Sequence, residues 1–381
     1  MEDIEEAIEK GDAEIVRKFI SDPKCDINRK IVKETKEKGK KDENYLLHIA
    51  VENEKKEILQ ILLSHPDINV NKRSFKLSKD KSKELTALHI AVKKGNEEIV
   101  RLLLTRPEID VNIKSFKRSK DKAEELTALH IATKNESLSI IQLLLSRQEL
   151  NVNIKSFELE KETRKEMTAL HFAVEKGNAV IVHCLLERPS IDLNLLSIKQ
   201  SKDSYKETTV LYKATKSGNT EIIRLLLSRS TIDINSKSNK RSKGKVEQLT
   251  SLHIATEKGN TEIVQLLCQN SIVDVNLRSF RKFKEKEDNM TPLHIAVEDE
   301  NLDIIRSLLS NPRINVNEKR FHKEKEKKKE KTALHIAVEK NNKDIIELLM
   351  ESHLIDINIK DENGKKPAEL TKDPKIIALI H

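Results

Sequence analysis

The chain has 381 residues, of which 35% are charged and 37% hydrophobic, with no tryptophan and a net charge of +8 at pH 7. No apolar run reaches the roughly 18 residues typical of a membrane-spanning helix. The acidic start, with Glu2, Asp3, Glu5 and Glu6, differs from the basic start of a secretory signal. We therefore expect a soluble intracellular protein, in the cytoplasm with the nucleus as the alternative.

A four-residue phrase, Thr-Ala-Leu-His or a close variant of it, occurs eight times at a constant step of 41 residues. The copies begin at Tyr45, Thr86, Thr127, Thr168, Thr209, Thr250, Thr291 and Thr332. A constant period in this range is typical of one supersecondary unit stacked on copies of itself. The sequence therefore predicts a tandem array, in which each residue must be interpreted by its place in the repeat.

One copy predicts two helices. Thr86 precedes an apolar run and can cap a first helix, which is expected to end at Gly95-Asn96, where glycine tolerates the left-handed conformation. A second helix follows over residues 97–104, with acidic residues in its first turn and apolar residues at helical spacing. Pro107 is expected to stop it.

These motifs strongly resemble the ankyrin repeat family: Thr-x-Leu-His-x-Ala, the following Gly-Asn, the Leu-Leu-Leu block, and Asp110-Val111-Asn112. The resemblance implies an all-α repeat solenoid of stacked helix-turn-helix units with extended β-hairpin fingers, and a concave binding surface formed by fingers and first helices. It also implies one ankyrin-repeat domain over residues 1–381. Residues 1–28 would be the N-terminal capping repeat, 29–360 the eight finger-plus-helix-pair repeats, and 361–381 the C-terminal cap.

The unit departs from the family in length, since an ankyrin repeat has about 33 residues. The family pattern places one extra residue before Asp110 and seven between Asn112 and Thr127. Seven residues shared by two strands lengthen each finger by roughly 11 Å at about 3.3 Å per residue. A symmetric hairpin would place Lys114 opposite Glu125, and the same reasoning predicts the pairs Arg73–Glu84, Lys155–Glu166 and Lys319–Glu330.

The eight fingers concentrate positive charge. They hold 43 lysines and arginines against 23 acidic residues, a net charge of +20, whereas the whole chain is only +8. Such an edge could attract an acidic protein segment, nucleic acid or anionic lipid headgroups. The alternative is that solvated hairpins simply need charged side chains, which also discourage edge-to-edge aggregation.

An aromatic residue recurs in the fingers. Phe75, Phe116, Phe157, Phe280 and Phe321 lie four residues after the repeat asparagine, with Ile198 and Asn239 at the two intervening positions. Each ring is expected to pack against the neighbouring finger and stiffen the hairpin. The alternative is a platform on which the bases of single-stranded nucleic acid stack.

Candidate catalytic and metal-binding residues are explained by the repeat. Seven of the twelve histidines are the repeat histidine, and equivalent helices stack about 8–10 Å apart, too far for two such rings to share a zinc ion. In the family this histidine orders the start of the first helix. Cys25, Cys184 and Cys268 lie where other repeats carry isoleucine or leucine, so we expect reduced core residues. We predict no enzyme and no cofactor.

The leading interpretation is a scaffold or adaptor that binds another protein, for which an acidic partner is one option, through its concave face and basic fingers. The alternative is a protein that binds RNA or a phosphoinositide membrane surface through the basic fingers. The helix position after Val92 varies in charge among repeats, as expected of a surface that is free from packing. The candidate partner-binding residues are Lys72, Arg73, Phe75, Lys76, Lys93, Lys114, Phe116, Lys117, Arg118, Lys134, Glu175, Lys216, Glu257, Phe280, Arg281, Glu298 and Phe321.

Overall fold

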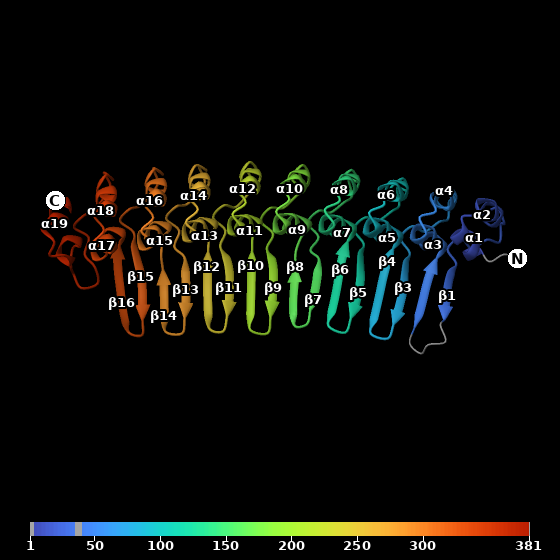
Figure 1. Ribbon diagram of the computed structural model, residues 1–381, viewed down its shortest axis with the longest axis horizontal. Helices are drawn as coiled ribbons and strands as arrows, with labels where there is room; N and C mark the ends of the chain where they lie inside the picture. The colour runs from blue at the N-terminus through green and yellow to red at the C-terminus, as the bar shows by residue number, and fades with distance from the viewer. Residues whose placement is uncertain (1–3, 35–39, 381) are drawn as a thin grey trace. The chain divides into compact units, whose positions relative to one another are not determined.

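The computed structural model describes residues 4–34 and 40–380. These residues fall into two compact units that meet in sequence between Ile191 and Asp192, called unit 1 and unit 2 below. In each unit the hairpins project from one side of the helix pairs, next to the first helix of each pair (Figure 1). This is the helix-turn-helix repeat solenoid with finger hairpins that the sequence predicts. That the whole chain is a single domain stays a prediction.

Unit 1 contains ten helices and eight strands among its described residues. The helices are α1 (Ile4–Lys10), α2 (Ala13–Ile20), α3 (Leu46–Glu52), α4 (Lys56–Ser64), α5 (Ala87–Lys94), α6 (Glu97–Leu103), α7 (Ala128–Lys134), α8 (Leu138–Leu145), α9 (Ala169–Lys176) and α10 (Ala179–Leu186). The strands are β1 (Lys30–Glu34), β2 (Lys41–Tyr45), β3 (Arg73–Ser78), β4 (Lys81–Thr86), β5 (Lys114–Ser119), β6 (Lys122–Thr127), β7 (Phe157–Glu160) and β8 (Thr163–Glu166).

Unit 2 repeats this order and ends in a cap. Its helices are α11 (Val210–Ser217), α12 (Thr220–Leu227), α13 (Ser251–Glu257), α14 (Thr261–Cys268), α15 (Pro292–Glu298), α16 (Leu302–Leu309), α17 (Ala333–Glu339), α18 (Lys343–Met350), the 3₁₀ helix η1 (Pro367–Leu370) and α19 (Pro374–Ile380). Its strands are β9 (Ser197–Ser201), β10 (Ser204–Thr208), β11 (Ser238–Ser242), β12 (Lys245–Leu249), β13 (Phe280–Phe283), β14 (Lys286–Asn289), β15 (Lys319–Glu324) and β16 (Lys327–Thr332).

Threonine and histidine start the first helices. In α5 the Thr86 side chain accepts a hydrogen bond from the backbone N–H of His89, and the Thr86 backbone N–H donates to Nδ1 of that histidine, which completes a capping box. The other ring nitrogen of His89 lies 3.0 Å from the carbonyl oxygen of Ile113. One neutral side chain therefore caps its own helix and binds the base of the next finger.

The turn between the two helices keeps a left-handed residue. Gly95 has φ of 72° there, and repeats without glycine place Glu54, Glu136, Glu300 or Asn341 in the same conformation. The glutamates gain a compensating contact with the next repeat: Glu54, for example, accepts hydrogen bonds from Lys94 (2.8 Å) and Asn96 (3.2 Å). The helix pair can therefore close without glycine, in agreement with the degenerate turn sequences.

The fingers form one continuous antiparallel sheet within each unit. Strands pair inside each hairpin, across a two-residue turn in the hairpins from β3–β4 onward, and also between hairpins, as β4 pairs with β5 in unit 1 and β10 with β11 in unit 2. Pairing between fingers was not predicted. It satisfies the backbone groups of the strands that a separate hairpin would leave exposed.

The predicted register is wrong by two residues. Lys114 lies opposite Thr127, and Glu125 lies opposite Phe116, because the turn is at Lys120-Asp121. The ion pairs survive on the diagonal, with Lys114 Nζ 3.8 Å from Glu125, Arg73 3.5 Å from Glu84 and Lys319 4.0 Å from Glu330. The fourth expected pair does not form among the described residues, since Glu166 binds Arg164 instead.

The repeat asparagines connect consecutive repeats. Asn112 Nδ2 donates to the carbonyl oxygen of Glu149 (2.9 Å), and its Oδ1 accepts from the backbone N–H of Asn151 (2.8 Å). Asn235 makes the same two bonds in unit 2, with Ile272 and Asp274. Each asparagine therefore holds the loop one repeat ahead, a role that the sequence analysis did not assign.

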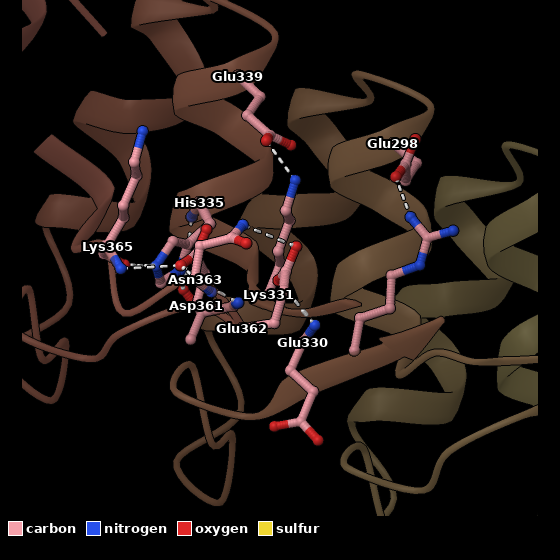
Figure 2. A network of polar contacts seen from close by, with 11 residues as sticks. Glu298, Glu330, Lys331, His335, Glu339, Asp361, Glu362, Asn363 and Lys365 are labelled. Atoms are coloured by element: carbon pink, nitrogen blue, oxygen red, sulfur yellow. Dashed lines mark hydrogen bonds and ion pairs between the residues drawn. The ribbon is translucent and has the colours of Figure 1, made fainter. Parts of the chain in front are cut away.

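A different segment closes the C-terminal end of unit 2 (Figure 2). The ring of His335 lies 3.2 Å from the carbonyl oxygen of Lys365, where earlier repeats use the next finger. Asp361 accepts hydrogen bonds from the backbone of Asn363 and Lys365, and Glu362 accepts one from the backbone of Glu330. Residues 361–365 thus satisfy polar groups that a further repeat would otherwise cover.

Candidate partner-binding face

Alternation along the strands gives each sheet two faces. Lys76 of β3 reaches Glu52 at the end of α3, at 3.0 Å, and Lys134 at the end of α7 reaches Glu124 of β6 and Glu158 of β7, at 2.7 and 2.6 Å. The strand positions of this parity therefore face the first helices, and the alternate positions face away. The helix-facing positions and the last residues of the first helices form one surface, here called the helix-facing surface.

In unit 1 one row of cross-strand neighbours runs through the helix-facing surface. In order it contains Lys33, Asp42, Lys76, Lys83, Lys117, Glu124, Glu158 and Lys165. Glu52, Lys93, Lys134 and Glu175 lie at the equivalent helix ends. Carboxylates balance much of this row, because Lys76 binds both Glu52 and Asp42, and Lys134 joins two glutamates.

The corresponding row of unit 2 begins with three lysines. In order it contains Lys199, Lys206, Lys240, Glu247, Arg281, Asp288, His322 and Lys329. The equivalent helix residues are Lys216, Glu257, Glu298 and Glu339. The sign therefore changes along the surface, from positive at β9–β11 to mixed at β12–β15, where Arg281 binds Glu257.

The last finger, β15–β16, carries charged residues at two helix-facing positions where the preceding repeat has uncharged ones. Arg320 occupies the position that Ser279 holds one repeat earlier; it binds Asp288 at 2.8 Å and also Glu298. Lys331 replaces the apolar Met290 and binds Glu339 (Figure 2). Arg320, Lys331 and His322 line a shallow hollow on this face. The end of the array thus replaces packing residues with ion pairs, as the outer side of a terminal repeat requires.

The finger phenylalanines lie on the opposite face of each sheet. Phe116 is half-buried, with Glu84 and Glu125 as its cross-strand neighbours. Phe157 lies beneath the Arg164 guanidinium, 5.7 Å from its ring centroid. The rings of neighbouring repeats are two strands apart, roughly 9.6 Å, with a glutamate or amide residue between them. Carboxylates within the row would repel nucleic acid phosphates, so the row does not favour base stacking.

The structure therefore divides the predicted site residues between the two faces. Lys76, Lys93, Lys117, Lys134, Glu175, Lys216, Glu257, Arg281 and Glu298 share the parity or helix position of the helix-facing surface. Arg73, Phe75, Lys114, Phe116, Arg118, Phe280 and Phe321 share the other parity. Lys72 precedes β3, and its ammonium lies 5.6 Å from the Tyr45 ring centroid. The same surface also contains Lys83, Lys199, Lys206 and Lys240, which were not predicted as site residues, although alternation along the strands could have identified them.

The repeat histidines are buried. Burial lowers the pKa of His48, His89, His130 and His253 to about 4, and that of His294 to about 3. The predicted ordering of the first helix by histidine is confirmed by the capping boxes. These residues therefore belong to the scaffold of the repeat.

The prediction that all three cysteines are core residues is only partly correct. Cys184 is buried, whereas Cys25 and Cys268 are only half-buried, so the expectation of core residues is wrong in degree for these two. Burial raises the pKa of all three thiols, that of Cys268 to about 11. Among the described residues, no three histidine, cysteine or acidic side chains are placed to hold a metal ion. No helix within residues 4–34 and 40–380 is long and apolar enough to cross a bilayer.

Stacked helix pairs with a laterally open, charged surface define a repeat protein of the binding-module class. A model of ankyrin repeats in three copies matches residues 4–115, 113–197, 151–238, 193–279, 237–320 and 279–361. The chain therefore belongs to the ankyrin repeat family, whose repeats are generally protein–protein interaction modules.

Two solved structures resemble the chain. The ankyrin repeat domain of Bcl-3, described as a unique member of the IkappaB protein family, has 20% identity and a TM-score of 0.39, over 77% of this chain and 96% of that one. The human ASB11 ankyrin repeat domain has 19% identity and a TM-score of 0.40, over 67% of this chain and 98% of that one. Comparison with curated protein sequences finds no match.

Proposed function

We propose that this protein is a scaffold or adaptor that binds a protein partner through the helix-facing surface of its fingers and first helices. The main support for the proposal is that scaffold positions are largely constant among the repeats, whereas positions on the helix-facing surface vary in charge. The capping threonine, most repeat histidines and the linking asparagines recur in the same role, whereas the helix-facing residues change sign from repeat to repeat. Residues that only stabilise a repeat need no such variation.

The opposite face supports a partner less well. Its phenylalanines are half-buried between strands and alternate with carboxylates or amides. Exposed aromatic anchors, which contribute strongly to many protein interfaces, are therefore lacking among the described residues of this row. We assign the opposite face to stabilising the lengthened fingers, a role that accounts for its side chains without a ligand.

Site-specific photo-crosslinking tests the proposal. A photoreactive phenylalanine analogue would replace Lys93 or Lys216, which lie at exposed helix ends on the helix-facing surface of units 1 and 2. Matched controls place it at Arg101 and Arg224, which are exposed on second helices. In cells that naturally produce the protein, we expect the first two positions to crosslink one polypeptide. Crosslinks to protein from the controls alone, or to RNA from all four positions, would contradict the proposal.

A further inference from the structure

Three lysines lie side by side on the helix-facing surface of unit 2. Lys206 of β10 is the register partner of Lys199 in β9 and of Lys240 in β11. Adjacent strands are about 4.8 Å apart, so the three positions span roughly 9.6 Å. Like charges directly opposite each other destabilise a sheet. This arrangement therefore opposes folding, and the fold alone does not explain it.

Within residues 4–34 and 40–380, no carboxylate pairs with Lys206 to offset this repulsion. It is half-buried, and its ammonium lies 5.7 Å from the centroid of the Tyr212 ring. Among the described residues, Lys199, Lys206 and Lys216 form no ion pair, and of the three strand lysines only Lys240 does, with Glu247 at 2.9 Å. Lys213 and Lys216 of α11 add positive charge from the helix side. Lys199, Lys206, Lys216 and Lys240 are called the lysine cluster below.

Several other half-buried cations on this surface are paired, although Lys83 and Lys165 form no ion pair among the described residues. Lys134 binds two glutamates, Arg281 binds Glu257, and Arg320 binds Asp288 and Glu298. Lys83 still has the carboxylate of Glu52 nearby, whereas the charges that act most on Lys206 are all lysines. Burial and the charges of Lys216, Lys213, Lys240 and Lys199 lower the pKa of Lys206 to about 8. A bound anion would relieve both the repulsion and the incomplete ionisation.

The carboxylates next to the lysine cluster on the helix-facing surface limit which kind of anionic ligand can bind there. Glu247 comes next in the row, and Glu257, Asp288 and Glu298 occupy the same surface of unit 2. A nucleic acid strand or an anionic membrane is negative along its whole extent, so these carboxylates would repel it. A peptide can change sign along its length. Two carboxylates on one side of an extended peptide, about 6.6 Å apart, fit within the span of the three strand lysines.

We propose that the lysine cluster of unit 2 is a docking site for an acidic segment of a protein partner, seated by at least two carboxylates. This inference rests on the proposed function and deepens it, because it states what one part of the partner must carry. The remaining, mixed part of the surface would receive neutral or basic residues of the same partner.

The first test measures the affinity of the full-length protein for a fluorescein-labelled peptide of alternating glutamate and serine. We expect Lys199→Gln/Lys206→Gln to weaken binding at least tenfold. The matched control is Lys202→Gln/Lys243→Gln, which removes the same charge from exposed finger tips in the same unit, and its affinity should stay within about twofold. Equal losses in the two variants, or tighter binding of oligouridylate than of the peptide, would overturn the proposal.

A second readout separates direct contact from misfolding. Bound carboxylates should raise the pKa of Lys206, so binding at pH 8 takes up roughly half a proton. Calorimetry in two buffers of different ionisation enthalpy measures this uptake. Lys206→Met should abolish it while the melting temperature stays equal or rises. Unchanged uptake in Lys206→Met, or none in the parent protein, would contradict the proposal.

Failure of the docking site and failure of the proposed function are distinguishable. If the acidic peptide does not bind but the probe at residue 216 still crosslinks a polypeptide, the docking site is wrong and protein binding stands. If neither occurs, both are wrong.

Discussion

The two units contain the same lysine triplet in different surroundings. Lys76, Lys83 and Lys117 are cross-strand neighbours in unit 1, as Lys199, Lys206 and Lys240 are in unit 2. Among the described residues each triplet has one paired lysine: Lys76 binds Glu52 and Asp42 in unit 1, and Lys240 binds Glu247 in unit 2. The central lysines differ, because Lys83 has Glu52 nearby, whereas the charges that act most on Lys206 are all lysines. The same backbone register therefore places the central lysine near a carboxylate in unit 1 and among lysines alone in unit 2. The strand register of the repeat determines which face these side chains lie on, but it does not determine their charge.

The largest expected effect lies in the scaffold that the two units share. The buried histidines have a pKa of about 4 or below, whereas an unfolded histidine titrates near 6.5, so the unfolded chain binds more protons between these values. Stability is therefore complete above about pH 6.5 and is lost as the pH falls towards 4. We expect a loss of several kcal/mol between pH 7 and 5, measured by denaturant unfolding. A flat profile over this range would contradict the neutral caps.

Removing a finger ring comes next in size. Phe116 is half-buried between β4 and β6, so Phe116→Ala should reduce stability by roughly 1–3 kcal/mol. Binding of the acidic peptide to unit 2 should not change, since the ring lies in unit 1. Unchanged stability together with lost nucleic acid binding would instead favour the base-stacking alternative.

Matched asparagine substitutions test whether the two units share one scaffold. Asn112→Ala and Asn235→Ala each remove two hydrogen bonds of the same geometry, one in each unit. We expect each to cost about 1–2 kcal/mol, with hydrogen exchange rising in its own unit. A loss confined to one of the variants would show that the linkage differs between the units.

The smallest effect concerns the lysines themselves. Lys206→Met removes the charge repulsion between residue 206 and its two cross-strand lysines, so it should stabilise the protein by roughly 0.5–1 kcal/mol. Lys83→Met should stabilise it less, because Lys83 has Glu52 nearby as well as the repelling Lys93, Lys76 and Lys117. Thermal unfolding of both variants measures the difference. A larger gain for Lys83→Met would reverse the comparison between the triplets.

Much of the fold follows from local patterns in the sequence. The capping threonine, the left-handed turn and the apolar spacing of the second helix act within a few residues, and all three predictions are confirmed. The finger register failed because symmetry about the segment midpoint misplaced the turn by one position, which shifts the partners by two. Strand pairing between fingers depends on residues one repeat apart, so it cannot be predicted from a local sequence pattern.

The candidate site was less predictable. Charge and position along the chain placed Arg73 and Phe75 in one predicted site with Lys76, although strand alternation puts Lys76 on the other face. Lys206 was not predicted as a site residue, because a single lysine does not stand out in a basic finger. Its importance comes from Lys199 and Lys240 on neighbouring strands, and this requires the register of three strands at once.

The most direct test of the central claim is an NMR titration of the Lys206 side chain in the full-length protein, with Lys206→Arg used to assign its signal. We expect a pKa of about 8 for Lys206 in the free protein, and a clearly higher value when the alternating glutamate–serine peptide is bound. An ordinary lysine pKa near 10.4 in the free protein, or a value that the peptide leaves unchanged, would contradict the claim that this cluster awaits an acidic partner.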